Sequence, residues 1–192
     1  YQGEELGMTN AQYNDISQYR DVESLNYYKI LLDQGKTKEQ ALKVLAARSR
    51  DNSRTPMQWS DDKNAGFTEG TPWIEAPENY KEINAETELK DPDSIYSFYK
   101  KLIALRKEKD IIAEGTIEFL EKENADVLAY RRNYQGEELI VLNNLTAENV
   151  TIRQQPEWKA YQKRLGNYEK ITAEDGKITL RPFETIVLDS AL

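Results

Sequence analysis

The spacing of the apolar residues changes once along the chain, and this change constrains the fold more than any other feature of the sequence. In the segments before residue 111 that show a regular period, apolar residues recur at the intervals of amphipathic helices. Beyond residue 111, they alternate with polar residues, as in β-strands that bury one face. We therefore expect two domains, over residues 1–110 and 111–192, of which the second is an all-β antiparallel sandwich.

Two helices are predicted near the beginning of the chain from their end signals. Asp21 is a suitable N-cap for a helix over residues 22–34, and Gly35 suits the position just past its end. Thr37 and Gln40 have the spacing of a capping box and predict the start of a second helix. Both helices carry leucines on one face, which indicates that they pack on a core.

A third helix and a short strand complete the prediction for the first part. The helix is expected from Asp91, with Pro92 in its first turn, to about Lys109. Tyr1–Met8 is expected to be one short strand, with two glycines that indicate a bend or a close backbone approach. The apolar stripe of the helix consists of Ile95, Phe98, Tyr99, Leu102 and Leu105.

Residues 49–92 show no clear period, and we expect a long, irregular but ordered connection. A connection of this length inside a compact domain is usually functional or disordered. Its tryptophans, Trp59 and Trp73, favour order. Four of the six prolines lie in this stretch: Pro56, Pro72, Pro77 and Pro92.

Short alternating runs after residue 111 predict the strands of the sandwich. The dipeptide Asp175–Gly176 and the segment Asn133–Gly136 are typical of hairpin turns. The expected strands are Thr116–Leu120, Asp126–Arg132, Glu138–Asn143, Asn149–Arg153, Lys159–Leu165, Lys177–Leu180 and Thr185–Leu188.

Composition excludes several classes of chemistry. The chain has no Cys and no His, which rules out disulfides, thiolate or imidazole metal sites and Ser/His/Asp triads within it. We expect no cofactor and no metal ion. A net charge of −8 argues against nucleic acid or an anionic membrane as partner. The first residue is Tyr1 rather than Met, and we expect the chain to be a piece of a longer protein.

Without His or Cys, a pair of carboxylates is the natural candidate for catalysis, as in glycosidases. Glu4 and Glu5 are the obvious candidates. Adjacent residues of a strand point to opposite faces, so these two cannot form the pair with each other, and at most one lies in a cleft. The structural interpretation, with one ion pair and one structural carboxylate, is favoured.

A segment rich in arginine, residues 49–59, is unusual for a plain loop, and we call it the arginine motif. It contains Arg50, Asp51, Arg54 and Trp59 within eleven residues. One interpretation is a salt-bridged loop that Trp59 pins in place. The other is a clamp for a sugar or a carboxylate, because a guanidinium presents several donors in a fixed fork. The residues alone do not choose between them, and the 12 tyrosines fit either sugar stacking or ordinary packing.

Two stretches resemble glycoside hydrolase family 13, the α-amylase superfamily. They are residues 1–10, Tyr-Gln-Gly-Glu-Glu-Leu-Gly-Met-Thr-Asn, and the arginine motif, Ser-Arg-Asp-Asn-Ser-Arg-Thr-Pro-Met-Gln-Trp. More narrowly, they resemble the branch of oligo-1,6-glucosidases and trehalose-6-phosphate hydrolases. Residues 19–26 and Ser53 are most similar to the latter, because oligo-1,6-glucosidases and dextran glucosidases more often have Ala at the position of Ser53. The resemblance covers essentially the whole chain.

The resemblance implies a mixed fold. The first part would be the last βα unit of a (β/α)8 TIM barrel with a long helical active-site connection. Tyr1–Met8 would be the eighth strand, and the helix that starts at Asp91 would be the eighth helix. Residues 9–90 would connect them on the face where barrel active sites lie. Residues 111–192 would be the C-terminal β-sandwich.

The resemblance also implies an activity for the longer protein. It would be a cytoplasmic retaining α-glycosidase that hydrolyses trehalose 6-phosphate to glucose and glucose 6-phosphate. One alternative is an α-1,6-glucosidase, and an alternative of another class is a carbohydrate-binding or scaffolding module. The expected partners are a small-molecule sugar and the missing N-terminal part. Self-association of the truncated barrel edge is also expected.

One site residue follows from the resemblance. The family's nucleophile Asp, its acid/base Glu and its third essential Asp lie before Tyr1, so no catalytic residue is expected here, and the chain alone is expected to be inactive. Arg54 matches the arginine that helps to hold the non-reducing-end glucose in the subsite next to the nucleophile. Asp51 is expected to support substrate binding by orienting Arg54.

Overall fold

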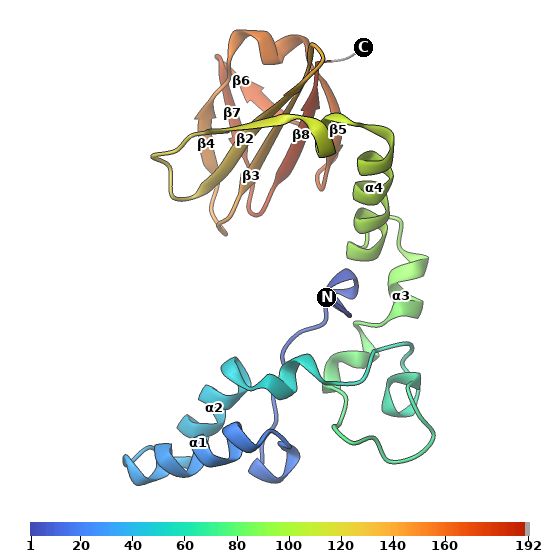
Figure 1. Ribbon diagram of the computed structural model, residues 1–192, viewed down its shortest axis with the longest axis vertical. Helices are drawn as coiled ribbons and strands as arrows, with labels where there is room; N and C mark the ends of the chain where they lie inside the picture. The colour runs from blue at the N-terminus through green and yellow to red at the C-terminus, as the bar shows by residue number, and fades with distance from the viewer. Residues whose placement is uncertain (191–192) are drawn as a thin grey trace. The chain divides into compact units, whose positions relative to one another are not determined.

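The structure is a computed structural model that describes residues 1–190 (Figure 1). The chain divides into two compact units, Tyr1–Ser97 and Phe98–Leu192. The first contains helices joined by irregular segments, and the second is dominated by strands. The helices that lie wholly in the first unit are α1 (Val22–Asp33), α2 (Lys38–Arg48), α3 (Ala85–Lys90) and the short 3-10 helices Glu4–Leu6, Ile16–Gln18, Arg50–Ser53, Lys63–Gly66 and Glu78–Lys81.

The predicted starts of α1 and α2 are confirmed. The Asp21 carboxylate accepts the backbone N–H of Ser24 and caps α1. Gly35 follows this helix with a φ of 83°, in the left-handed region that glycine favours. Thr37 and Gln40 form both hydrogen bonds of a capping box at the start of α2. Local polar chemistry therefore sets the ends of both helices.

The core of the first unit lies where α1 and α2 face each other and the preceding loop. Leu31 and Leu45 are each only 2% exposed. Tyr19 is also 2% exposed and contacts the ring of Tyr13 edge-on, with centroids 5.2 Å apart. The buried cluster consists of Ala11, Tyr13, Tyr19, Tyr28, Leu31, Ala41, Leu45 and Ile74.

No helix within residues 1–190 has both the length and the apolarity that a membrane crossing requires.

The strand expected at Tyr1–Met8 is not formed, and this prediction was wrong. The segment folds into the 3-10 helix Glu4–Leu6 instead. Gly3 and Gly7 have φ values of 89° and 71°, which turn the backbone back on itself. The N–H of Met8 donates to the carbonyl of Gly3 at 3.0 Å, so these backbone groups bond locally rather than to a neighbouring strand.

Helix α4 (Ile95–Glu108) starts later than expected. Ser94 caps it, because its hydroxyl accepts the backbone N–H of Ser97 at 3.1 Å. Asp91 instead accepts the N–H of Asp93 in the preceding turn, at 2.8 Å. This turn takes up the residues that were predicted as the first helical turn. The apolar stripe of α4 is partly exposed, since 38% of Leu102 is accessible while Leu105 is buried.

The second unit is a sandwich of two antiparallel sheets, as predicted. The strand orders are β1-β2-β3-β8-β5 in the larger sheet and β4-β7-β6 in the smaller one. Short helix α5 (Ile111–Glu114) precedes the first strand. The strands are β1 (Thr116–Leu120), β2 (Val127–Tyr134), β3 (Glu137–Asn144), β4 (Val150–Arg153), β5 (Gln162–Gly166), β6 (Thr172–Glu174), β7 (Lys177–Leu180) and β8 (Thr185–Asp189).

Two strand predictions need correction. The expected strand Lys159–Leu165 begins only at Gln162, because a 3-10 helix, Pro156–Ala160, occupies its start and buries Trp158. Strand β6 was not predicted, since all three of its residues are exposed and carry no apolar alternation. The predicted hairpin turns are confirmed: Gly136 and Gly176 have φ values of 89° and 71°.

The core of the sandwich fills the space between its two sheets. Ile140, Leu142, Ile178 and Ile186 are each 0% exposed. They come from strands of both sheets, which explains why one face of each strand is apolar. The cluster consists of Val127, Ala129, Ile140, Leu142, Ile152, Trp158, Ile178, Leu180, Ile186 and Leu188.

Hydrogen exchange on the chain should show its strongest protection in the sandwich. Strand β3 pairs with β2 and β8 along both edges, so its amides open only with much of the larger sheet. Residues 59–82 contain only short 3-10 helices and should exchange fastest. Amide exchange followed by mass spectrometry at peptide resolution measures this difference. Equal and strong protection along the whole chain in a dilute monomer would contradict the prediction.

Candidate functional site

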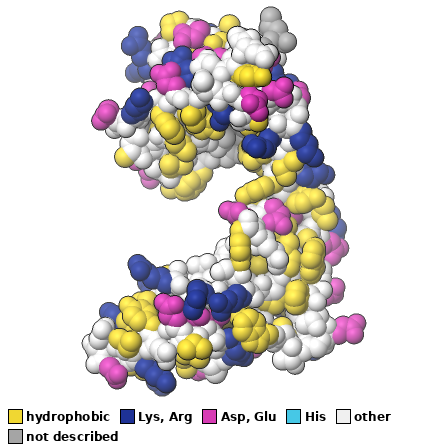
Figure 2. Space-filling model, viewed as in Figure 1, with side chains coloured by type: hydrophobic (Ala, Val, Ile, Leu, Met, Phe, Trp, Pro, Cys, Tyr) yellow, Lys and Arg dark blue, Asp and Glu magenta, His cyan; other side chains and the backbone are white. Residues whose placement is uncertain are grey.

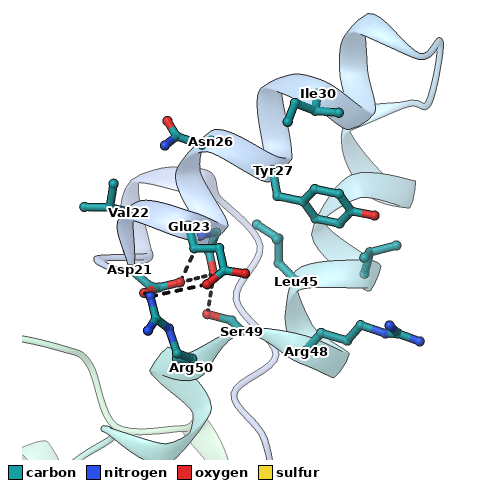
Figure 3. Close-up of a pocket in the computed structure, with 12 residues that line it drawn as sticks. Asp21, Val22, Glu23, Asn26, Tyr27, Ile30, Leu45, Arg48, Ser49 and Arg50 are labelled. Atoms are coloured by element: carbon teal, nitrogen blue, oxygen red, sulfur yellow. Dashed lines mark hydrogen bonds and ion pairs between the residues drawn. The ribbon is translucent and has the colours of Figure 1, made fainter.

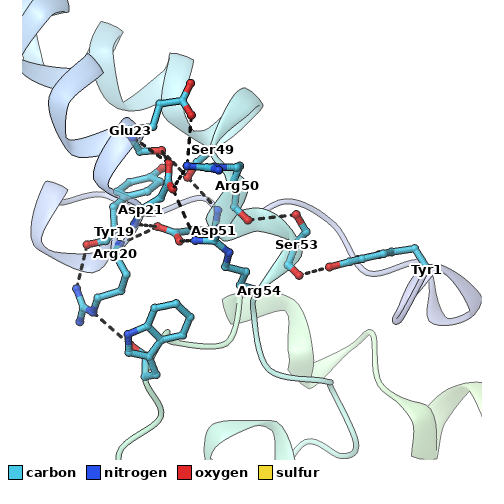
Figure 4. Close-up of polar contacts among 12 residues, drawn as sticks. Tyr1, Tyr19, Arg20, Asp21, Glu23, Ser49, Arg50, Asp51, Ser53 and Arg54 are labelled. Atoms are coloured by element: carbon cyan, nitrogen blue, oxygen red, sulfur yellow. Dashed lines mark hydrogen bonds and ion pairs between the residues drawn. The ribbon is translucent and has the colours of Figure 1, made fainter.

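Segments 19–24 and 49–54 lie against each other where α1 begins and α2 ends (Figure 4). Ser49 connects the two helix ends, because its hydroxyl forms a 2.8 Å hydrogen bond with the Ser24 hydroxyl. The Ser49 hydroxyl also accepts the backbone N–H of Asp51 at 3.1 Å and thereby caps the 3-10 helix Arg50–Ser53. This tight turn brings the arginine motif to the start of α1.

Asp51 is the buried centre of this arrangement, with 0% of its surface exposed. Its Oδ2 accepts the backbone N–H groups of Arg20 and Asp21 at 2.7 and 2.9 Å. A carboxylate buried this deeply is stable only where hydrogen bonds and opposite charge replace its hydration. Asp51 therefore fixes the segment before α1 against the arginine motif.

Arg54 faces two carboxylates through one nitrogen. Its Nη1 lies 3.5 Å from Oδ1 of Asp51 and 3.6 Å from Oδ1 of Asp21. Within residues 1–190, these are the only ion pairs of Arg54. The side chain is 37% exposed. Its Nε and Nη2 are therefore not occupied by these carboxylates and can donate to another group.

Arg50 makes a tighter contact with the same cluster. Its Nη2 lies 2.9 Å from Oδ1 of Asp21 and 3.4 Å from Oε2 of Glu23. Burial opposes the ionisation of Asp21, but hydrogen bonds from Ser24 and the charge of Arg50 outweigh it and hold the pKa of Asp21 below its ordinary value. At neutral pH, Asp21 is a carboxylate.

Tyr19 lies beneath this cluster and stays protonated. Burial, together with the nearby charge of Asp51, raises the pKa of Tyr19 to about 12. Within the described residues, its hydroxyl has no hydrogen-bond partner. Tyr19 is 2% exposed and belongs to the buried cluster of the first unit, so it serves as packing.

The two stretches that carry the family resemblance meet at a small cavity. The Tyr1 hydroxyl donates to the carbonyl of Ser53 (Figure 4). Of the two predicted candidates, Glu4 lines this cavity, whereas Glu5 accepts the backbone N–H of Gly3 at 2.9 Å. This agrees with the structural interpretation of the pair. The cavity measures about 270 Å³ and is lined by Tyr1, Gln2, Gly3, Glu4, Met8, Thr9, Asn10, Asn52, Ser53 and Thr55.

A larger open cavity of about 670 Å³ lies along the facing sides of α1 and α2. Figure 3 shows Tyr27 on α1 and Arg48 on α2 beside it. Arg54 does not line this cavity. Its lining mixes one aromatic ring with aliphatic and charged side chains: Asp21, Val22, Glu23, Ser24, Asn26, Tyr27, Ile30, Val44, Leu45, Arg48, Ser49 and Arg50.

The structural interpretation of the arginine motif is confirmed in its ion pairs but wrong about Trp59. That side chain is 53% exposed and does not belong to the buried cluster of the first unit. The buried anchor is its neighbour Gln58, 0% exposed, whose side-chain amide donates to the carbonyl of Ile83.

The sequence correctly predicted that Asp51 contacts Arg54, but the contact between Asp21 and Arg54 was missed. Asp21 was predicted only as a helix cap. No signal in the sequence indicates this contact, because partly exposed arginines need no carboxylate partner and Asp21 lies far from the motif along the chain. No group of His, Cys, Asp and Glu suited to a metal ion occurs within residues 1–190.

Comparison with known proteins identifies related sequences over both units. Residues 1–115 match the family described as "Alpha amylase, catalytic domain". Residues 127–187 match "Alpha-amylase SusG C-terminal domain". The trehalose-6-phosphate hydrolase of Bacillus subtilis (strain 168) is 48% identical over 97% of this chain and 34% of its own length. The oligo-1,6-glucosidase of Bacillus cereus is 43% identical over the same shares.

A solved structure gives the same result. The crystal structure of Bacillus licheniformis trehalose-6-phosphate hydrolase aligns with a TM-score of 0.92 and 47% identity. The alignment covers 98% of this chain and 35% of that one. The chain thus spans about a third of the length of the relatives that it matches. Because the catalytic-domain match covers residues 1–115, more than half of the sequence, the chain belongs to glycoside hydrolase family 13, the α-amylase family.

Proposed function

We propose that the full-length protein hydrolyses trehalose 6-phosphate to glucose and glucose 6-phosphate. The observation that carries this proposal is the 48% identity to the Bacillus subtilis trehalose-6-phosphate hydrolase over 97% of this chain. The trehalose-6-phosphate hydrolase of Escherichia coli (strain K12) supports it, at 45% identity over the same share. The reaction would be a double displacement through a glycosyl-enzyme intermediate on an aspartate, with retention of configuration.

An α-1,6-glucosidase is the second candidate function. The 43% identity to the Bacillus cereus oligo-1,6-glucosidase favours it almost as much. The argument for the first candidate is Ser53, where the α-1,6-glucosidases more often have Ala. In the structure, the Ser53 hydroxyl donates to the carbonyl of Arg50 at 3.1 Å, so its contribution is to the shape of the turn.

The two activities are separated by assaying the full-length enzyme on trehalose 6-phosphate and on isomaltose. We expect hydrolysis of trehalose 6-phosphate with the larger kcat/KM. Proton NMR of the glucose formed, recorded before mutarotation, should show the α anomer, because a retaining mechanism preserves the anomeric configuration. A larger kcat/KM on isomaltose would select the second candidate, and initial release of β-glucose would overturn the retaining mechanism.

Within this enzyme, we propose that Arg54 binds the substrate and that Asp51 orients the Arg54 side chain. Support comes from the geometry of the guanidinium. One nitrogen faces the buried Asp51 carboxylate at 3.5 Å, and 37% of the side chain is exposed. A planar fork held at one corner can direct its remaining N–H groups to a sugar hydroxyl.

Two further proposals concern the cellular location of the protein and the boundary between its two domains. We place it in the cytoplasm, because a charged sugar phosphate does not cross a lipid bilayer and its hydrolase must share its compartment. We assign residues 1–110 to the catalytic part and residues 111–192 to the sandwich. The start of the first strand at Thr116 and the end of the catalytic-domain match at residue 115 support this division.

The isolated chain should also self-associate. An apolar groove of about 740 Å³ runs between α4 and the larger sheet, and Figure 2 shows apolar side chains gathered on the surface of the sandwich. Leu102, Leu128 and Phe183 line it and are 38%, 41% and 60% exposed. Exposed apolar surface of this kind favours association. Sedimentation velocity over a wide concentration range should therefore show species larger than a monomer.

A charged side chain placed in this groove tests whether the groove causes the self-association. We expect Leu102→Asp to shift the population toward the monomer. The matched control is Val22→Asp, which introduces the same charge at a residue that is 69% exposed in the other unit. An unchanged sedimentation profile for Leu102→Asp, or an equal shift in the control, would show that the groove does not drive association.

A further inference from the structure

The two oxygens of Asp21 have different partners. Oδ2 accepts the backbone N–H of Ser24 at 3.0 Å and the Ser24 hydroxyl at 2.9 Å, which caps α1. Oδ1 faces the arginine motif instead. It lies 2.9 Å from Nη2 of Arg50 and 3.6 Å from Nη1 of Arg54. The side chain is only 4% exposed.

Capping does not require the charge of Asp21. Asn, Ser and Thr cap helices about as well as Asp, because one oxygen that accepts the backbone N–H is sufficient. A buried carboxylate is moreover costly unless opposite charge compensates it. Here the compensating charges belong to Arg50 and Arg54, so the charge of Asp21 is matched to the arginine motif rather than to the helix.

Asp21 and Asp51 together restrict the orientation of Arg54. Both carboxylates contact the same nitrogen, Nη1, from two separately fixed positions. Asp51 is held by the backbone N–H groups of residues 20 and 21, and Asp21 is held by Ser24. A guanidinium that faces one carboxylate can swing around it, whereas two fixed carboxylates define where its other N–H groups point.

Arg50 contacts the cluster at a shorter distance than Arg54. Its Nη2 lies 2.9 Å from Oδ1 of Asp21 and 3.4 Å from Oε2 of Glu23. The cluster also has no excess of positive charge, because its three carboxylates outnumber the two arginines that pair with them. It is therefore suited to orienting a donor for a neutral hydroxyl rather than to collecting an anion.

We propose that Asp21 is a positioning residue for the substrate, acting through the contact of its Oδ1 with Arg54. This rests on the proposed substrate-binding role of Arg54. The role is distinct from capping α1, because the two tasks use different oxygens of one carboxylate. Asp21 has no contact with the reacting atoms in this proposal.

The variant Asp21→Asn separates the two tasks. Its amide oxygen can still cap α1, whereas the charge that faces the arginines is lost. In the full-length enzyme, we expect kcat/KM on the preferred substrate to fall about tenfold, a part of the loss for a whole charge-assisted contact. The double variant Asp21→Asn/Arg54→Ala should lose no more than Arg54→Ala alone, because Asp21 acts through Arg54.

Additive losses in this cycle would overturn the proposal, since a merely structural role does not depend on Arg54. Thr37→Ala is the control for the loss of a helix cap. It removes the side-chain cap of α2 and leaves the contacts of Asp21 intact, so it should lower the melting temperature with little effect on kcat/KM. If Thr37→Ala reproduced the tenfold loss, lost helix stability rather than the lost charge would be responsible.

A second readout does not depend on activity. In the chain of 192 residues, the 15N-labelled Nη1 group of Arg54, which faces both carboxylates, should give an NMR signal displaced from that of free arginine. Asp21→Asn should move this signal toward the position of free arginine, whereas Glu23→Gln, which alters a contact of Arg50 alone, should not. An unchanged Arg54 signal in Asp21→Asn overturns the positioning. A shifted signal, together with a normal kcat/KM for Arg54→Ala, overturns the substrate-binding role instead.

Discussion

The isolated chain of 192 residues is expected to release no glucose from trehalose 6-phosphate, isomaltose or any other α-glucoside. Glycosidases of this kind need two carboxylates on opposite sides of the scissile bond. The family resemblance places all three essential acids before Tyr1. Glu4 and Glu5, the candidates near the beginning of the chain, bind the N-terminal amine and the backbone N–H of Gly3. Removal of such groups lowers kcat by about a millionfold.

The measurement is a coupled assay for released glucose with the chain and the full-length enzyme side by side. The full-length enzyme shows that the assay detects turnover, and a mock purification from the same host strain gives the background from host glucosidases. Turnover above this background, which co-purifies with the chain, would mean that residues 1–192 hold a complete catalytic site. The prediction that the isolated chain lacks the catalytic residues would then be wrong.

Much of the fold could be predicted where local chemistry decides the structure. Asp21 and the pair Thr37 and Gln40 have side chains that bond their own helix starts, so a short sequence window contains the whole cause. The turn at Asp175–Gly176 needs two positive φ angles, which these residue types tolerate. The strands with a buried face were visible for the same reason, because their alternation reflects the core between the two sheets.

Predictions failed where the structure of a segment depends on residues that are distant in the sequence. Tyr1–Met8 has the composition of a strand, but its glycines turn the backbone, and no strand lies within residues 1–97 for it to pair with. Strand β6 is defined by its pairing with β7 and not by any apolar residue of its own. Asp21 belongs to the site only because α1 and α2 pack together and bring its carboxylate to Arg54, so no spacing in the sequence reveals the contact.

Arg54→Ala in the full-length enzyme is expected to lower kcat/KM by roughly ten- to a hundredfold. Loss of one charge-assisted hydrogen bond to the sugar would cost about 1.5–3 kcal/mol. Arg54→Lys should not restore activity, because an ammonium group has no planar fork and cannot face Asp51 and a sugar hydroxyl at the same time. Steady-state kinetics of both variants and their melting temperatures are the quantities to measure.

The competing explanation is that Arg54 only neutralises the two buried carboxylates. Arg54→Ala would then lower the melting temperature and leave kcat/KM normal. A matched control is Arg164→Ala in the sandwich, because Arg164 is 38% exposed, close to the 37% of Arg54, and pairs with Glu108. Both variants remove one partly exposed arginine from an ion pair. A loss of kcat/KM in Arg54→Ala alone would therefore report substrate binding, because loss of an ion pair is common to both proteins.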